Sequence, residues 1–278
     1  MRKILIVCIV VVMLFSLVFL YYYNRWKPLW ELDDEREKYP IEHHSDATLR
    51  VVMIGDSWAE IHSALSMDDV LCSYLEVKLD CPVEVKSKGK SGKRSRGIYE
   101  LMFNDDVFGT KPLLSAGANY CIVLGGINDA SANLGTKQFC HYMRLIINFL
   151  LTNDIRPVIV EVPDVNIGKV FWRKPIRNLV IDYMRSLMTR CRIYHYAEYR
   201  EALKTMLVEN HLFEMVVYVD MDSWNICSPQ LHKHLFLNDQ IHLNREGYIQ
   251  LDSAIASAIA NDYLNRHINN DENLKYGN

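Results

Sequence analysis

Arg50-Val51-Val52-Met53-Ile54-Gly55-Asp56-Ser57-Trp58-Ala59-Glu60 is a short apolar run that ends in an abrupt polar turn. The run is rich in β-branched residues and predicts a buried strand that stops at Gly55. Glycine lets the backbone turn sharply there, and open α/β folds bind ligands beyond the carboxyl ends of their strands. Gly-Asp-Ser is also an ordinary turn composition, so any function of Ser57 depends on partners elsewhere in the chain.

Further strands with polar ends follow along the chain. The sequence predicts them at Val83–Val85, Tyr120–Leu124, Val158–Val162 and Met215–Val219. Helical patterns separate them: one begins at a predicted capping box, Ser66-x-x-Asp69, and another carries an apolar face. Strands that alternate with helices imply a mainly parallel sheet covered on both faces. We therefore expect one α/β domain over residues 49–266 and a polar tail over 267–278. The helical pattern with the apolar face follows the strand Tyr120–Leu124, and that face consists of Phe139, Met143, Ile146 and Leu150.

The N-terminal region predicts a membrane anchor. Ile4 to Tyr23 is almost wholly apolar and is long enough to cross a bilayer as a helix. Arg2 and Lys3 precede it, so the positive-inside rule keeps the N-terminus cytoplasmic. A cleaved signal peptide is the alternative, but no small-x-small cleavage site follows the apolar run. We expect a single-pass anchor over residues 1–26, a charged tether over 27–48, and a domain on the periplasmic or equivalent extracytoplasmic side.

Composition narrows the function further. The chain has 278 residues and a net charge of −3, which suits one globular domain with appendages and predicts no nucleic-acid partner. Its cysteines match no small disulfide scaffold, so we expect them to be mostly free. His43-His44 and His232-x-His234 lack the further ligands of a metal site. The sequence predicts neither a metal nor another cofactor.

Three residues have the chemistry of serine-based ester hydrolysis. Such a reaction needs a nucleophile, a base that takes its proton, and a carboxylate that orients the base. Ser57, His242 and Asp239 provide this set, because a separation of three residues lets Asp239 reach Nδ1 of His242. The backbone N–H groups of Ser57 and Gly92 and the amide of Asn128 are candidate donors to the oxyanion.

The motifs that hold these residues resemble those of the SGNH or GDSL hydrolases over about residues 50–264. The resemblance implies a flavodoxin-like three-layer α/β/α fold, metal-free ester or thioester hydrolysis, and the family's roles for Ser57, Gly92, Asn128 and His242. Trp58 departs from the family, which has leucine there, and the second block lacks its usual upstream asparagine. The four blocks are Gly55-Asp56-Ser57, Ser91-Gly92, Gly126-Ile127-Asn128-Asp129 and Asp239-x-x-His242-Leu243-Asn244.

A basic loop over residues 86–97 surrounds Gly92. We expect Lys90, Lys93 and Arg94 to bind an anionic substrate, although a solvated loop explains this composition equally well. The sequence as a whole predicts a serine esterase that removes O-acyl groups, in particular O-acetyl groups, from a cell-envelope or extracellular polysaccharide. A lipid-ester hydrolase or lysophospholipase and a glycan O-acyltransferase are the alternatives. A non-catalytic binding module would not need the complete set of candidate catalytic residues.

Overall fold

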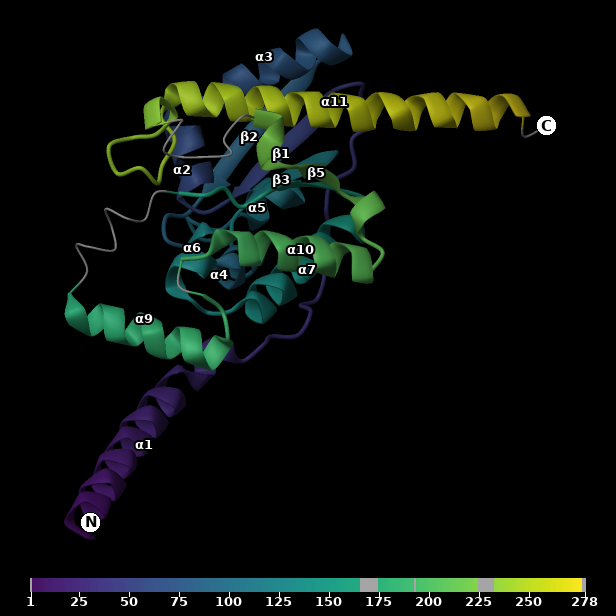
Figure 1. The fold of residues 1–278 in the computed structure, drawn as a ribbon. Coiled ribbons are helices and arrows are strands. Elements are labelled where there is room, and N and C mark those ends of the chain that lie inside the picture. The colour runs from purple at the N-terminus through teal and green to yellow at the C-terminus, as the bar shows by residue number, and fades with distance from the viewer. Residues whose placement is uncertain (1, 166–174, 193, 225–232, 277–278) are drawn as a thin grey trace. The chain divides into compact units, whose positions relative to one another are not determined.

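The computed structural model describes residues 2–165, 175–192, 194–224 and 233–276 (Figure 1). The chain forms two compact units, Met1–Arg36 and Glu37–Asn278. The first unit contains the helix α1 (Arg2–Trp30), the one helix among the described residues that is long and apolar enough to span a membrane. It includes the predicted span and continues beyond it to Trp30, with Pro28 in its last turn. A signal sequence and an anchor share these features.

The second unit is built on a five-stranded parallel sheet in the order β2-β1-β3-β4-β5. This order is that of flavodoxin-like folds, and it confirms the α/β class expected from the sequence. The register places Gly55, at the end of β1, between Gly89 of β2 and Leu124 of β3. The strands are β1 (Leu49–Gly55), β2 (Val83–Gly89), β3 (Tyr120–Leu124), β4 (Arg156–Val160) and β5 (Val217–Val219).

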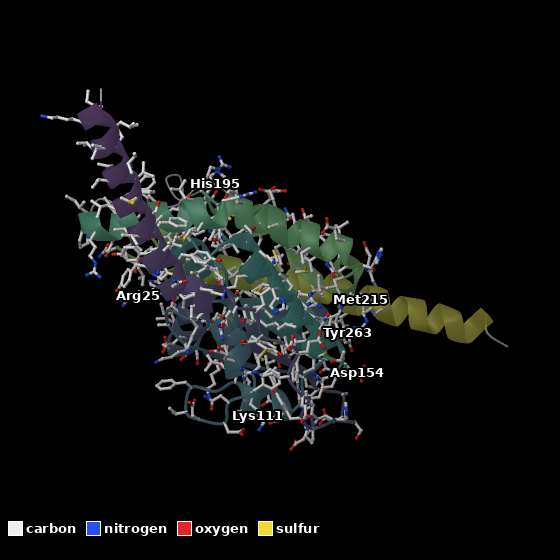
Figure 2. The ribbon with its side chains drawn as sticks, turned by 90° about the horizontal axis from the view of Figure 1, so that it is seen from below. Arg25, Lys111, Asp154, His195, Met215 and Tyr263 are labelled. Carbon is white, nitrogen blue, oxygen red and sulfur yellow. The ribbon has the colours of Figure 1, made fainter. Side chains whose placement is uncertain are left out.

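Helices cover both faces of the sheet (Figure 1). Helices α3 and α11 pack together on one side, and α4, α7 and α10 pack on the other. Figure 2 shows α10 between His195, which precedes its first turn, and the η1 turn that contains Met215. The helices of this unit are α2 (Ser57–Ala64), α3 (Asp68–Leu79), α4 (Ser95–Leu101), α5 (Lys111–Ser115), α6 (Ile127–Ala132), α7 (Thr136–Leu151), α9 (Ile176–Thr189), α10 (Tyr196–Glu209) and α11 (Arg245–Tyr276), with short turns η1 (Phe213–Met215), η2 (Met221–Trp224) and η3 (Lys233–Leu235).

The core lies between the sheet and these two helical layers. All five residues of β3 are buried, as expected for a parallel strand that is covered on both faces. The apolar face predicted for α7 also points inward, which confirms the sequence pattern. Its members Phe139, Met143, Ile146 and Leu150 are all buried.

The start of α3 differs from the prediction. The helix begins at Asp68 without a side-chain cap, and Ser66 has a positive φ of 53°. The predicted capping box, Ser66 with Asp69, is therefore wrong, because Met67 and not Ser66 is the N-cap residue. The Asp68 carboxylate accepts hydrogen bonds from the backbone and the hydroxyl of Ser87 on β2. The apolar pattern of this segment predicts Val77 in the core together with Leu71 and Leu75, but Val77 is 85% exposed while the two leucines are buried.

Part of the predicted tether packs against the second unit. The ring of Tyr39 lies 5.1 Å from that of Phe149, and Glu42 donates its backbone N–H to the carbonyl of Ser115 at 2.8 Å. Six residues, Glu31–Arg36, therefore separate α1 from the second unit. The cysteines in the described residues are free, and Cys227 lies outside those residues. The free cysteines are Cys8, Cys72, Cys81, Cys121, Cys140 and Cys191.

Candidate active site

Ser57, His242 and Asp239 form a continuous hydrogen-bonded chain. The Nε2 atom of His242 lies 2.9 Å from Oγ of Ser57, and its Nδ1 atom lies 2.6 Å from Oδ2 of Asp239. The sequence predicted these three residues, and the fold brings them together although Ser57 and His242 are 185 positions apart. In this arrangement the imidazole can take the serine proton at Nε2 while the carboxylate holds the proton on Nδ1.

The turn after β1 positions Ser57. Asp56 caps α2 by accepting the N–H of Trp58 at 3.0 Å, which places Ser57 in the first helical position. Gly55 is required for this turn, because a Cβ atom there would lie 2.3 Å from the carbonyl oxygen of Leu124. The serine is thus fixed at the carboxyl edge of the sheet, where β1 lies between β2 and β3.

A tight turn before α11 positions the other two residues. Asp239 accepts the backbone N–H groups of Ile241 at 2.8 Å and His242 at 3.0 Å, in addition to the ring contact. Burial alone would raise the pKa of Asp239, but these donors outweigh it and hold the pKa below its ordinary value. The carboxylate therefore stays ionised, which suits a group that orients an imidazole.

Asn128 lies at the carboxyl end of β3, as the second residue of α6. Its Nδ2 atom donates to Oδ2 of Asp56 at 2.9 Å and to the carbonyl of Lys93 at 3.0 Å. An amide nitrogen has two hydrogens, so both are already engaged in this structure. A hydrogen bond from Asn128 to an oxyanion would therefore require one of these partners to be exchanged.

Asn128 has two buried acids as neighbours, Asp56, which accepts its amide, and Asp129, which follows it in the chain. The sequence did not indicate their role. Burial raises the pKa of Asp56 to about 7 and that of Asp129 to about 6. The carboxylate of Asp129 accepts the hydroxyl of Ser95 at 2.6 Å, so it fastens the start of α4. Buried carboxyls with raised pKa values next to a cleft are typical of functional sites. Sequence spacing does not indicate that Asp56 would bind Asn128 or that Asp129 would bind Ser95.

The predicted basic loop is shorter than expected, because β2 continues to Gly89 and α4 begins at Ser95. Gly92 lies at its centre with φ +75°, a conformation that favours glycine. Among the residues that the structure describes, none other than the chain neighbours of Gly92 lies within 4 Å of the position a Cβ would take. Ser91 donates its backbone N–H to Glu60 at 2.8 Å, and its hydroxyl also donates to that carboxylate. Glu60, three residues after Ser57 on α2, therefore fixes this loop beside the nucleophile.

Several cations of the basic region already have partners within the protein. Lys86 pairs with Glu84 at 2.5 Å, and Nζ of Lys90 lies 3.7 Å from the centre of the Phe108 ring. Arg94 is close enough to lower the pKa of Asp129 by its charge, although burial of that acid has the larger effect. These contacts reduce the positive charge that the loop can offer to a substrate. Lys93 contributes its carbonyl to Asn128.

Trp58, which follows Ser57 in the chain, is buried. Its ring packs edge-on against Trp224 at 6.0 Å and against Tyr248 at 6.5 Å, and the Tyr248 hydroxyl donates to the Trp58 carbonyl at 2.8 Å. A cavity of about 10 Å³ adjoins this ring, roughly the room of one water molecule. It is lined by Asp56, Trp58, Leu124, Gly125, Ile127, Val160, Glu161 and Pro163.

A second histidine that the sequence did not single out, His62, lies on the buried side of α2. His62 is completely buried between two carboxylates, with Nδ1 3.0 Å from Asp68 and Nε2 2.9 Å from Asp252. Asp252 is itself fully buried on α11. In the sequence, the one sign of the pair formed by His62 and Asp252 is that Asp252 stands alone as an acid among the apolar residues of α11. The ion-paired cluster ties α2, α3 and α11 together.

The chain matches a known protein family, and its fold is similar to that of several solved structures. Residues 53–249, more than half of the chain, match the GDSL-like lipase/acylhydrolase family. No curated protein matches. Similar solved structures include an acetyl xylan esterase, with 16% identity, a TM-score of 0.54, and coverage of 76% of this chain and 100% of the other. They also include a putative lipolytic protein of the G-D-S-L family from Desulfitobacterium hafniense, with 16% identity, a TM-score of 0.51, and coverage of 75% of this chain and 98% of the other. A lipase/acylhydrolase from Enterococcus faecalis has 14% identity, a TM-score of 0.51, and coverage of 77% of this chain and 96% of the other.

Proposed function

Because the chain belongs to the GDSL-like lipase/acylhydrolase (SGNH hydrolase) family and is an esterase of that type, we propose that Ser57, His242 and Asp239 carry out its catalysis. The observation that supports these roles is the unbroken chain of hydrogen bonds from the Ser57 hydroxyl through the His242 ring to Asp239. This arrangement aligns a nucleophile, its base and an orienting acid as serine hydrolysis requires.

The proposed reaction has two steps. The Ser57 oxygen attacks the ester carbonyl while Nε2 of His242 takes its proton, and the leaving alcohol then receives that proton from His242. Water next attacks the acyl-serine with His242 again as the base, which releases the acid and restores Ser57. The backbone N–H groups of Ser57 and Gly92 and the amide of Asn128 stabilise the oxyanion in both steps. For Asn128, we propose that the hydrogen now bound to the Lys93 carbonyl turns to the oxyanion while the hydrogen bond to Asp56 is kept.

Asn128→Ala tests the oxyanion role. Loss of one such donor typically lowers turnover by about 100- to 1000-fold, so we expect kcat for an acetate ester to fall in that range with little change in KM. Ser131→Ala, on the same helix α6, is the matched control and should keep wild-type kinetics. A rise in KM alone would instead show that Asn128 only binds the substrate.

We also propose that the acyl group is short, in particular acetyl. In this proposal the acyl group lies against Trp58, the residue after Ser57, where a cavity of about 10 Å³ leaves room for a small group only. An acetyl xylan esterase is among the proteins of similar fold, although a likeness at this identity concerns the fold. The alcohol part is proposed to be a cell-envelope or extracellular polysaccharide, with Lys90, Lys93 and Arg94 as further contacts.

A chain-length series of nitrophenyl esters tests this substrate class. We expect kcat/KM to be highest for acetate and to fall steeply with longer chains, because burial of extra methylenes needs space next to Trp58. Trp58→Leu should raise the ratio of butyrate to acetate activity by about tenfold, the effect of one or two methylenes. Phe213→Leu, which removes a ring at the amino end of β5, is the control. A preference for long chains in the wild-type protein would favour a lipid-ester hydrolase, and transfer to an added sugar would favour an acyltransferase.

The proposed location is extracytoplasmic, with α1 as an uncleaved anchor and the N-terminus in the cytoplasm. The lysine and arginine before the apolar run and the absence of a small-x-small cleavage site support this orientation. An anchored esterase would act on esters close to the membrane on that side.

A further inference from the structure

Helix α9 turns an apolar face to solvent. Four large side chains spaced by four, three and four positions project from one side of the helix. With a rise of 1.5 Å per residue they form a stripe ~16 Å long. The stripe consists of Ile176, Val180, Tyr183 and Leu187, which are 80%, 53%, 59% and 72% exposed.

The inward side of α9 is fixed by polar contacts. Asp182 is buried and accepts the hydroxyl of Tyr194 at 2.7 Å, and Arg185 donates to the carbonyl of Ala132 at 3.2 Å. These bonds hold the helix with its apolar stripe outward. On α7, by contrast, the apolar face points into the core. A contiguous exposed stripe of this kind is uncommon in soluble domains and marks a surface that binds something apolar.

We propose that α9 lies in the surface of the lipid bilayer, with the stripe Ile176, Val180, Tyr183 and Leu187 inserted at the level of the headgroups. Arg177 and Arg190, at the two ends of the helix, are exposed and form no ion pair with another residue that the structure describes. An amphipathic helix that carries cations beside its apolar face is the usual form of an interfacial membrane helix. The two arginines would bind anionic headgroups.

The short segment between α1 and the second unit also favours a lipid surface as the partner of the apolar stripe. Only Glu31–Arg36 separates α1 from the second unit, and six residues span at most ~20 Å. If α1 is an uncleaved anchor, the domain must stay against the bilayer, and some part of its surface must meet the headgroups. The inference therefore rests on the proposed anchor, and it adds the face by which the domain meets the membrane. Tyr183 suits that zone because its ring is apolar and its hydroxyl is polar.

The test uses the full chain in vesicles of phosphatidylcholine and phosphatidylglycerol. A photoreactive azidophenylalanine replaces Tyr183, and in a matched control it replaces Val77, which is 85% exposed on α3. Figure 1 shows α3 and α9 on opposite sides of the domain. We expect the yield of lipid adducts from position 183 to exceed that from position 77 by about tenfold, because only an interfacial side chain contacts lipid. A probe at Val180 should give the same result and replaces position 183 if that variant does not fold.

Further arms separate the possible outcomes. Arg177→Glu together with Arg190→Glu should lower the lipid adducts several-fold in vesicles that contain phosphatidylglycerol and much less in pure phosphatidylcholine. Equal lipid adducts at positions 183 and 77, or adducts from 183 mainly to a second copy of the chain, would overturn the inference. Resistance to alkaline extraction reports separately on α1. If the chain is extracted, the anchor proposal fails; if it stays in the membrane without lipid adducts at 183, only the role of α9 fails.

Discussion

Ser57→Ala is expected to lower kcat for an acetate ester by about a million-fold, the usual cost of removing the nucleophile of such a triad. The hydroxyl of Ser57 is the group in hydrogen-bond contact with Nε2 of His242. Alanine keeps the first position of α2 helical and leaves the turn after β1 unchanged, so the fold should persist. Steady-state hydrolysis of the ester measures the loss.

Ser63→Ala is the matched control, because Ser63 is an exposed serine on the same helix. It should retain wild-type turnover. His242→Ala should be almost as damaging as Ser57→Ala, and the double variant should be no worse than either, because the two groups act as one unit. Asp239→Asn should lower kcat by as much as, or by less than, Ser57→Ala and His242→Ala. A folded Ser57→Ala protein with wild-type turnover would refute the assignment of the nucleophile.

Local patterns were sufficient to predict that five strands exist and that Asp239 meets His242, although the predicted bounds of β2, β4 and β5 differ from the observed ones. β1 and β3 are apolar runs with polar ends, and a separation of three residues brings an acid to its histidine within one turn. The five-stranded parallel sheet follows from the same alternation. These features depend on residues close together in the chain, which is why the sequence alone reveals them.

The partners of buried polar groups were not predictable in this way. Asp56 holds Asn128 across 72 positions, and Glu60 holds Ser91 across 31. No periodicity relates such residues, so only the folded chain shows that they meet. The capping box predicted at Ser66 failed because Met67 is the N-cap and Ser66 takes a positive φ, while the neighbouring Asp68 carboxylate binds Ser87 on β2. Local propensity is a weak guide wherever a tertiary contact can satisfy the same group.

The second large effect concerns stability and involves His62. His62→Leu is expected to lower the free energy of unfolding by about 3–5 kcal/mol, because it leaves Asp252 and Asp68 without their shared cation in a buried site. Both ring nitrogens of His62 are engaged, at 3.0 Å and 2.9 Å. Leucine fills a similar volume, so the loss reflects the unpaired acids more than a cavity. Urea unfolding followed by tryptophan fluorescence measures it.

Two variants test this cause. His43→Leu replaces an exposed histidine and should leave the free energy of unfolding unchanged. Asp252→Asn added to His62→Leu should restore part of the lost stability, because it removes the buried charge that the histidine no longer neutralises. If the double variant is as unstable as the sum of the two single variants predicts, the cost of His62→Leu does not come from the unpaired carboxylate.

The same cluster should make stability depend on pH. Burial lowers the pKa of His62, but hydrogen bonds to Asp252 and Asp68 outweigh it and raise the pKa to about 9, from about 6.5 in the unfolded chain. A group whose pKa is raised on folding stabilises the protein fully below its unfolded value and ceases to do so as the pH rises through its folded value. The wild-type protein should therefore lose about 3 kcal/mol of stability between pH 6.5 and 9 from this one residue. His62→Leu should lack that decline, so the stability curves of the two proteins should converge toward alkaline pH. Curves that stay parallel across this range would show that His62 is neutral in the folded protein and that the two acids do not hold it as a cation.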